Sequence, residues 1–109
     1  MAYDVLLEKR LDELIADRSD FHKQKMFGGL GYLLRGNMCF AIWKDSLILR
    51  LGQEQANKSL TSKNAQPFDI TGRAMKGWVM VLPAGIKTGN ILKEQIRLAI
   101  QYVSTLPRK

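Results

Sequence analysis

Three short apolar runs, separated by two turn-like tripeptides, dominate residues 25–51. Each run has the length of a β-strand, and the separating tripeptides at 35–37 (Arg-Gly-Asn) and 44–46 (Lys-Asp-Ser) have the composition of tight turns. Apolar runs joined in this way are typical of consecutive antiparallel strands. The sequence therefore predicts an antiparallel sheet on which the other elements must pack.

Amphipathic helices are predicted at both ends of the chain. In residues 3–18, leucine and isoleucine recur at helical spacing, and Asp4 stands where an N-cap carboxylate is expected. In residues 88–104 a second apolar stripe follows the same spacing, with Thr88 or Asn90 as the N-cap. Isolated helices of this length are marginal in water, so we expect both stripes to pack on the sheet.

The remaining segments complete an α+β fold. The predicted elements are a polar connection at 19–25, three strands within 26–51, a short helix at 53–60, a loop at 61–67, and strands at 68–70 and 77–82. The order is thus α-β-β-β-α-β-β-α, a two-layer domain with helices packed on one antiparallel sheet. A length of 109 residues fits one domain, residues 1–109.

Charge is distributed unevenly along the chain. The net charge is +7, yet residues 1–20 contain six acidic and three basic side chains, which leaves 14 basic and four acidic ones for the rest. A well-charged soluble surface accounts for this distribution, and an anionic partner for the basic part is the alternative. If nucleic acid is that partner, the candidate contacts are the cations in or near the turns of the sheet: Arg35, Lys44, Arg50, Arg73 and Lys76.

Arg50 interrupts an apolar strand, where burying an unpaired charge would be costly. It is expected either to pair with a carboxylate, such as Asp45 or Asp69, or to contact a bound anion.

The chain offers little for catalysis or metal binding. It has one histidine, His22, and one cysteine, Cys39, which lies inside an apolar run and is predicted to be a small buried side chain. Acid–base and nucleophilic catalysis need paired groups, and metal sites need several ligands. We therefore expect no enzyme, no metal and no cofactor.

The N-terminus lacks the features of a signal peptide, and no apolar run is long enough to cross a bilayer. A single cysteine suits a reducing compartment, so a cytoplasmic protein without membrane contact is expected.

Several short motifs resemble the N-terminal domain of the TfoX (Sxy) family, which includes regulators of natural competence in bacteria. They occur in order as Met26-Phe27-Gly28-Gly29-Leu30-Gly31-Tyr32, Gly36-Asn37-Met38, Leu49-Arg50, Pro67-Phe68, Gly72-Arg73 and Met75. The motif residues expected to have structural roles are Met26, Phe27, Gly28, Gly29, Gly31 and Gly72. From the residues themselves, the glycines between 28 and 31 indicate a bulge, a turn or a close approach by another group.

The resemblance implies a fold like that of secretion chaperones and a binding or regulatory module without catalytic activity. Competence regulators of this type carry a second, C-terminal domain, whereas this sequence ends at Lys109. A single-domain member is therefore expected. It would act through protein–protein contacts linked to transcription, with a homodimer as one form. Direct DNA binding through the basic sheet and turn surface is the alternative.

Overall fold

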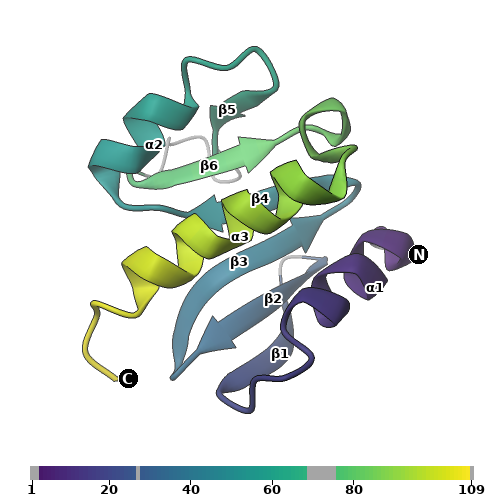
Figure 1. The fold of residues 1–109 in the computed structure, drawn as a ribbon, viewed down its shortest axis with the longest axis vertical. Helices are drawn as coiled ribbons and strands as arrows, with labels where there is room; N and C mark the ends of the chain where they lie inside the picture. Colours follow the sequence, from purple (N-terminus) through teal and green to yellow (C-terminus); the bar gives the residue numbers. More distant parts are fainter. Residues whose placement is uncertain (1–2, 27, 69–75, 109) are drawn as a thin grey trace.

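The computed structural model describes residues 3–26, 28–68 and 76–108. Within them, three α-helices lie against a six-stranded antiparallel sheet of order β1-β2-β3-β4-β6-β5, and α1 and α3 lie on the same side of it (Figure 1). The elements are α1 (Val5–Leu14), β1 (Phe21–Met26), β2 (Gly29–Leu34), β3 (Asn37–Trp43), β4 (Ser46–Arg50), α2 (Gln53–Ser59), β5 (Ala65–Pro67), β6 (Trp78–Val81), the 3-10 helix η1 (Pro83–Ile86) and α3 (Gly89–Val103).

The predicted α+β class, with helices packed on an antiparallel sheet, is confirmed. The prediction of a polar connection at 19–25 is wrong for most of its length, because residues 21–26 form β1, which pairs with β2 along its whole length. The structure therefore contains one strand, β1, in addition to the strands that were predicted. β1 is an edge strand whose four central side chains are exposed, so it lacks the apolar pattern by which strands are found in a sequence.

The strand expected at 68–70 is displaced toward the N-terminus. Residues 65–67 form β5, whereas Phe68 follows the strand and residues 69–70 lie outside the described part of the chain. Pro67 is tolerated in β5 because this strand is the other edge of the sheet and pairs only with β6.

Helix α1 begins at its predicted cap. One carboxylate oxygen of Asp4 accepts hydrogen bonds from the backbone N–H groups of Leu6 and Leu7, at 2.9 and 3.2 Å. The helix ends at Leu14, four residues earlier than predicted. Thr88, one of the two predicted caps, accepts from the N–H of Ile91 at the start of α3.

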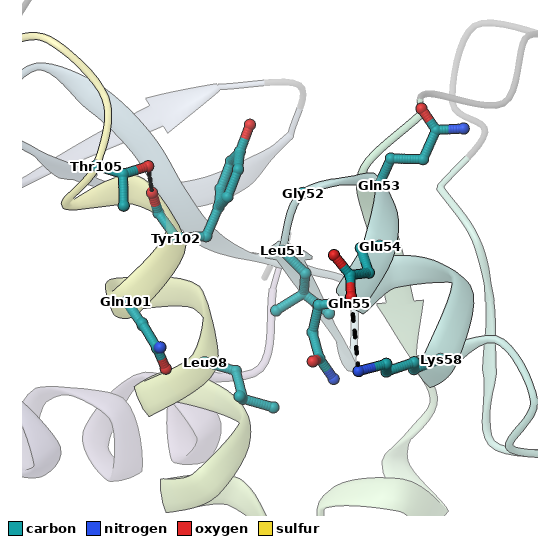
Figure 2. A pocket seen from close by; sticks show the side chains of 10 residues that line it. All are labelled: Leu51, Gly52, Gln53, Glu54, Gln55, Lys58, Leu98, Gln101, Tyr102 and Thr105. Carbon is teal, nitrogen blue, oxygen red and sulfur yellow. Dashed lines mark hydrogen bonds and ion pairs between the residues drawn. The ribbon is translucent and has the colours of Figure 1, made fainter.

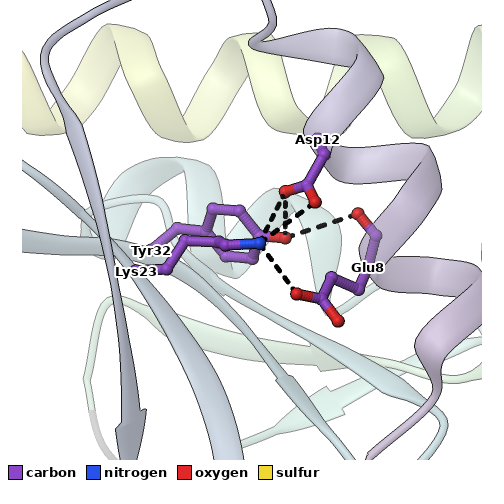
Figure 3. Close-up of polar contacts among 4 residues, drawn as sticks. All are labelled: Glu8, Asp12, Lys23 and Tyr32. Atoms are coloured by element: carbon purple, nitrogen blue, oxygen red, sulfur yellow. Dashed lines mark hydrogen bonds and ion pairs between the residues drawn. The ribbon is translucent and has the colours of Figure 1, made fainter.

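A polar cluster fixes α1 to the sheet (Figure 3). The hydroxyl of Tyr32, on β2, donates to Asp12 at 2.8 Å, and the ammonium of Lys23, on β1, bonds to Glu8 at 2.8 Å and to Asp12 at 3.1 Å. Burial, followed by the neighbouring carboxylate of Asp12, raises the pKa of the Tyr32 hydroxyl. Tyr32 is therefore a neutral donor to α1 at every physiological pH.

The core fills the space between the helices and one face of the sheet. Tyr32 and Phe40 are fully buried there, and their rings stack with centroids 4.6 Å apart. All three α-helices contribute: Leu7 and Leu11 from α1, Ala56 from α2, and Leu92, Ile96, Ala99 and Val103 from α3. The apolar stripes of both long helices are therefore used on this side.

A β-bulge lies in β3. Tyr32 pairs with Phe40 and Leu33 pairs with Met38, which leaves Cys39 as an additional residue on the β3 side. The register shift places Leu33 and Met38 on the face of the sheet that points away from the helices, while Phe40 stays in the core. The bulge expected within 28–31 is not found there: it lies in β3, opposite Tyr32 and Leu33.

Close approach explains two of the motif glycines. A Cβ atom on Gly29 would overlap the carbonyl oxygen of Ile42 on β3, and a Cβ on Gly31 would lie 3.0 Å from side-chain atoms of both Met26 and Met38. Gly28 takes a positive φ of 74° in the turn between β1 and β2. Phe27 and Gly72, the other motif residues with expected structural roles, lie outside the described residues.

Candidate functional site

The second face of the sheet, here called the sheet face, points away from all three α-helices. Along β4 and β6 the alternate residues Leu47, Leu49, Val79 and Val81 belong to the helix-side core, so the residues between them point the other way. The side chains of the sheet face, by the same alternation and by register, are His22, Gln24, Met26, Leu33, Met38, Ala41, Trp43, Ser46, Ile48, Arg50, Gln66, Trp78 and Met80. The side chains from the middle of the edge strands β1 and β5 are exposed, Ser46 and Ile48 are buried, and the others are half-buried.

Arg50 occupies a defined position on the sheet face. Its guanidinium carbon lies 5.4 Å from the ring centroid of Trp78, its cross-strand neighbour, and one guanidinium nitrogen lies 3.5 Å from the carbonyl oxygen of Met38. Phe68 packs on the same indole, with ring centroids 5.9 Å apart. The expected ion pair with Asp45 is wrong, because Asp45 precedes β4 and Arg50 is its last residue, at the opposite end of the strand. Asp69 lies outside the described residues.

The other candidate cations are spread over two ends of the sheet. Lys44 lies in the β3–β4 turn, with its ammonium 4.7 Å from the ring centroid of Trp43. Arg35, in the β2–β3 turn, approaches Asp20 at 3.9 Å, and the exposed Lys76 precedes β6. These last two share the end of the sheet at which Arg50 lies, and Lys44 lies at the other end. Arg73 is outside the described residues, so the structure brings the predicted set to no single point.

A second feature, the α2–α3 groove, was not predicted from the sequence; Figure 2 shows the first of its two hollows. The groove consists of two hollows that share Leu98 as a common wall. One, of about 470 Å³, lies between α2 and the C-terminal half of α3, and the other, of about 500 Å³, lies between the α2–β5 loop, η1 and the N-terminal half of α3. Its walls come from residues between 51 and 65 and between 81 and 105, two segments that the fold brings together.

Tyr102 and Gly52 form one end of this groove. Gly52 has a φ of +80°, and a Cβ there would lie 2.6 Å from the ring of Tyr102. The backbone N–H groups of Leu51 and Gly52 both donate to the carbonyl oxygen of Gly77, at 2.8 and 3.1 Å. The junction between β4 and α2 is therefore fixed to the start of β6 and holds this end of the groove in place.

Cys39 is fully buried, as predicted. Burial raises the pKa of its thiol to about 12. Among the residues that the structure describes, no group of three or more His, Cys, Asp or Glu side chains could hold a metal ion.

We expect Cys39 to resist alkylation by iodoacetamide at pH 8 in the native protein, because the thiolate is the reactive form and the thiol is buried. In denaturant the same thiol should react at the rate of a free cysteine. Mass spectrometry of the two time courses checks this, and fast labelling of the native chain would contradict the placement of Cys39 in the interior.

One comparison with known proteins decides the family. The model of the TfoX N-terminal domain matches residues 13–103, which is most of the chain. The chain belongs to the TfoX N-terminal domain family. The match spans every described strand and the Met-Phe-Gly-Gly motif, and it indicates a module like those of competence regulators. No curated protein and no solved structure matches the chain. In the described part of this TfoX-family chain, no helix has the length and apolar character needed to span a membrane.

Proposed function

We propose that this TfoX-family domain is a non-enzymatic regulatory module that acts by binding another protein through the sheet face. One observation carries the proposal: a face that carries three Met, two Trp and Arg50 is left uncovered by the described helices. Aromatic residues, Met and Arg are enriched in protein interfaces, whereas Asp, Glu and Lys are depleted. A cytoplasmic location, where such regulators would meet their partners, remains part of the proposal.

The physical character of the sheet face fits a protein partner. Met26, Met38 and Met80 are flexible and polarisable, so they can adapt to an irregular apolar surface. Trp78 and Arg50 are held against each other before any partner arrives, which reduces the entropy lost on binding. Trp and Arg are also the residues at which binding energy most often concentrates.

The charge of this face selects among partners. None of the described strands contains Asp or Glu, and Arg50 and Lys44 lie on or beside the face. Two copies packed face to face would bring these cations together, whereas a partner with carboxylates around an apolar centre would neutralise them. A partner of the second kind is therefore favoured over a homodimer.

Nucleic acid is the second candidate, and the absence of acidic residues from the described strands also favours it. Its contacts would be Arg35, Lys44, Arg50, Arg73 and Lys76. The arrangement is less suited to base stacking, because Lys44 already lies over Trp43, and Arg50 and Phe68 already pack on Trp78.

The test replaces Trp78 with alanine and compares it with Lys93→Ala, an exposed residue of α3 on the other side of the sheet. A partner would be isolated with the tagged wild-type chain from its own cells, purified and titrated directly by calorimetry. Loss of about 2 kcal/mol at a binding hot spot corresponds to a roughly 30-fold weaker Kd for Trp78→Ala, with no change for Lys93→Ala. Equal affinities for both variants would refute a role for the sheet face.

Two parallel measurements separate the alternatives. Sedimentation at two protein concentrations detects a homodimer. Titration of a labelled 20-nucleotide DNA, single-stranded and duplex, at two salt concentrations detects nucleic-acid binding, whose log affinity should fall with log salt by about 0.9 per phosphate contact on the duplex. If the chain binds DNA in a salt-dependent way, if Arg50→Gln weakens that binding, and if no protein partner is found, nucleic-acid binding would replace protein binding as the proposed function.

A further inference from the structure

We propose that the α2–α3 groove is a second binding site, which takes an uncharged peptide segment in an extended conformation. This site is separate from the sheet face, because its walls are formed by α2, the α2–β5 loop, η1 and α3 on the helix side of the molecule. Four properties of the groove support this occupant: the spacing of its two hollows, its charge balance, one buried polar atom and its exposed apolar side chains.

The two hollows lie next to each other along α3. Leu98 lines both hollows, Gln95 lines the hollow at the N-terminal half of α3, and Tyr102 lines the hollow at its C-terminal half. At 1.5 Å per residue, the seven residues from Gln95 to Tyr102 span about 10 Å. In an extended peptide of the polyproline II type, which has three residues per turn and rises about 3.1 Å per residue, side chains three residues apart point to the same side and lie about 9 Å apart. One such segment can therefore place a side chain in each hollow, with its backbone crossing over Leu98.

The groove is balanced in charge although the chain as a whole carries +7. Glu54 pairs with Lys58 at 3.9 Å along α2, and Glu94 pairs with Arg97 along α3. The other polar lining side chains are neutral, and most are amides and hydroxyls: Gln53, Gln55, Ser59, Ser62, Asn64, Asn90, Gln95, Gln101, Tyr102 and Thr105. A charged ligand finds no unpaired opposite charge in this lining, whereas the amides of a peptide backbone find both donors and acceptors.

Gln95 supplies the most specific observation. Its side-chain oxygen Oε1 is buried and has no hydrogen-bond partner among the described residues, while its nitrogen Nε2 makes a long contact of 3.5 Å with the carbonyl oxygen of Gly85. A buried acceptor without a partner is unfavourable. A small rotation of the amide toward the hollow would let Oε1 accept a hydrogen bond from a backbone N–H of the peptide.

Apolar side chains at the groove provide the remaining affinity. Ile91, at one hollow, is 47% exposed, which is unusual for an isoleucine on a helix that packs against a core. Leu98 is half-buried between the hollows, and the ring of Tyr102 forms a wall of the other. Covering these surfaces would remove apolar area from water, at about 25 cal/mol per Å².

The test uses a display library of random twelve-residue peptides selected on the folded chain. We expect enrichment of uncharged peptides that have two apolar residues three positions apart. A selected, fluorescently labelled peptide is then titrated against the Gln95→Met, Leu98→Ala and Lys93→Ala variants. Gln95→Met removes the acceptor at similar volume and should weaken binding about 10-fold, whereas Lys93→Ala, away from the groove, should not change it.

Thermal unfolding of each variant shows that the fold is retained, and Gln95→Met keeps the test valid if Leu98→Ala fails to fold. Peptides that bind Gln95→Met and Leu98→Ala as tightly as the wild type would overturn the proposal, and so would a library without enriched sequences. The outcome is distinguishable from that of the proposed function, because Trp78→Ala should leave this peptide's affinity unchanged.

Discussion

Replacing Phe40 with alanine should lower the free energy of unfolding by about 3–5 kcal/mol. Phe40 has no exposed surface, stacks on Tyr32 at 4.6 Å and contacts Phe21, with ring centroids 5.5 Å apart. Its removal leaves a cavity at the centre of the sheet, since aromatic neighbours held by backbone pairing cannot collapse into the space. At about 4 °C or more per kcal/mol, the midpoint of thermal unfolding should fall by at least about 12 °C.

A matched control for this variant is Leu6→Ala. Leu6 is 75% exposed on α1, so its truncation should change stability by no more than about 0.5 kcal/mol. Urea unfolding of both variants, followed by circular dichroism, gives the two values on one scale. Similar losses for Phe40→Ala and Leu6→Ala would contradict a core in which Phe40 is central.

The second large effect is expected for Gly29→Ala, at about 3 kcal/mol, the upper end for inserting atoms into a packed region. The new Cβ would overlap the carbonyl oxygen of Ile42, which belongs to the backbone of β3 and cannot move without disturbing the β2–β3 pairing. Gly28→Ala is the neighbouring control: a Cβ there has no atom within 4 Å, so only the positive φ opposes it, at about 1 kcal/mol.

Chemical denaturation of these two glycine variants separates steric overlap from backbone conformation. If Gly28→Ala were the more destabilising change, the requirement for two consecutive glycines would come from the turn conformation and not from the close approach of Gly29 to β3.

The parts of the fold that were predicted well are those with strong local patterns. Strands β2, β3 and β4 are apolar runs because both of their faces are at least partly buried, and the turns between them contain typical turn residues. The N-caps Asp4 and Thr88 were predicted because a side chain in that place satisfies free backbone N–H groups. β1 was missed because hydrogen bonds to β2, and not burial, make it a strand.

The candidate site was less predictable. Arg50 was correctly singled out as an unusual charge in a strand, but its neighbours were chosen by closeness in sequence. Asp45, five positions away, lies across the length of β4, whereas Trp78, 28 positions away, is the cross-strand partner. The α2–α3 groove joins residues of α2 and the α2–β5 loop to residues of η1 and α3, and no pattern within either segment predicts it.

The additional residue in β3 has a consequence for how this surface can evolve. Counting back from Phe40 without it, position 38 would turn toward the helices, and a cysteine would stand where a methionine now meets the solvent side. Straightening the strand with Cys39 still present would thus exchange interior and exterior for the start of the strand, and would also take the thioether of Met38 away from Gly31. Loss of Cys39 itself would remove the bulge and leave Met38 and Phe40 on their present faces. The composition of the outward surface therefore depends on this one additional residue as much as on the residues that form the surface.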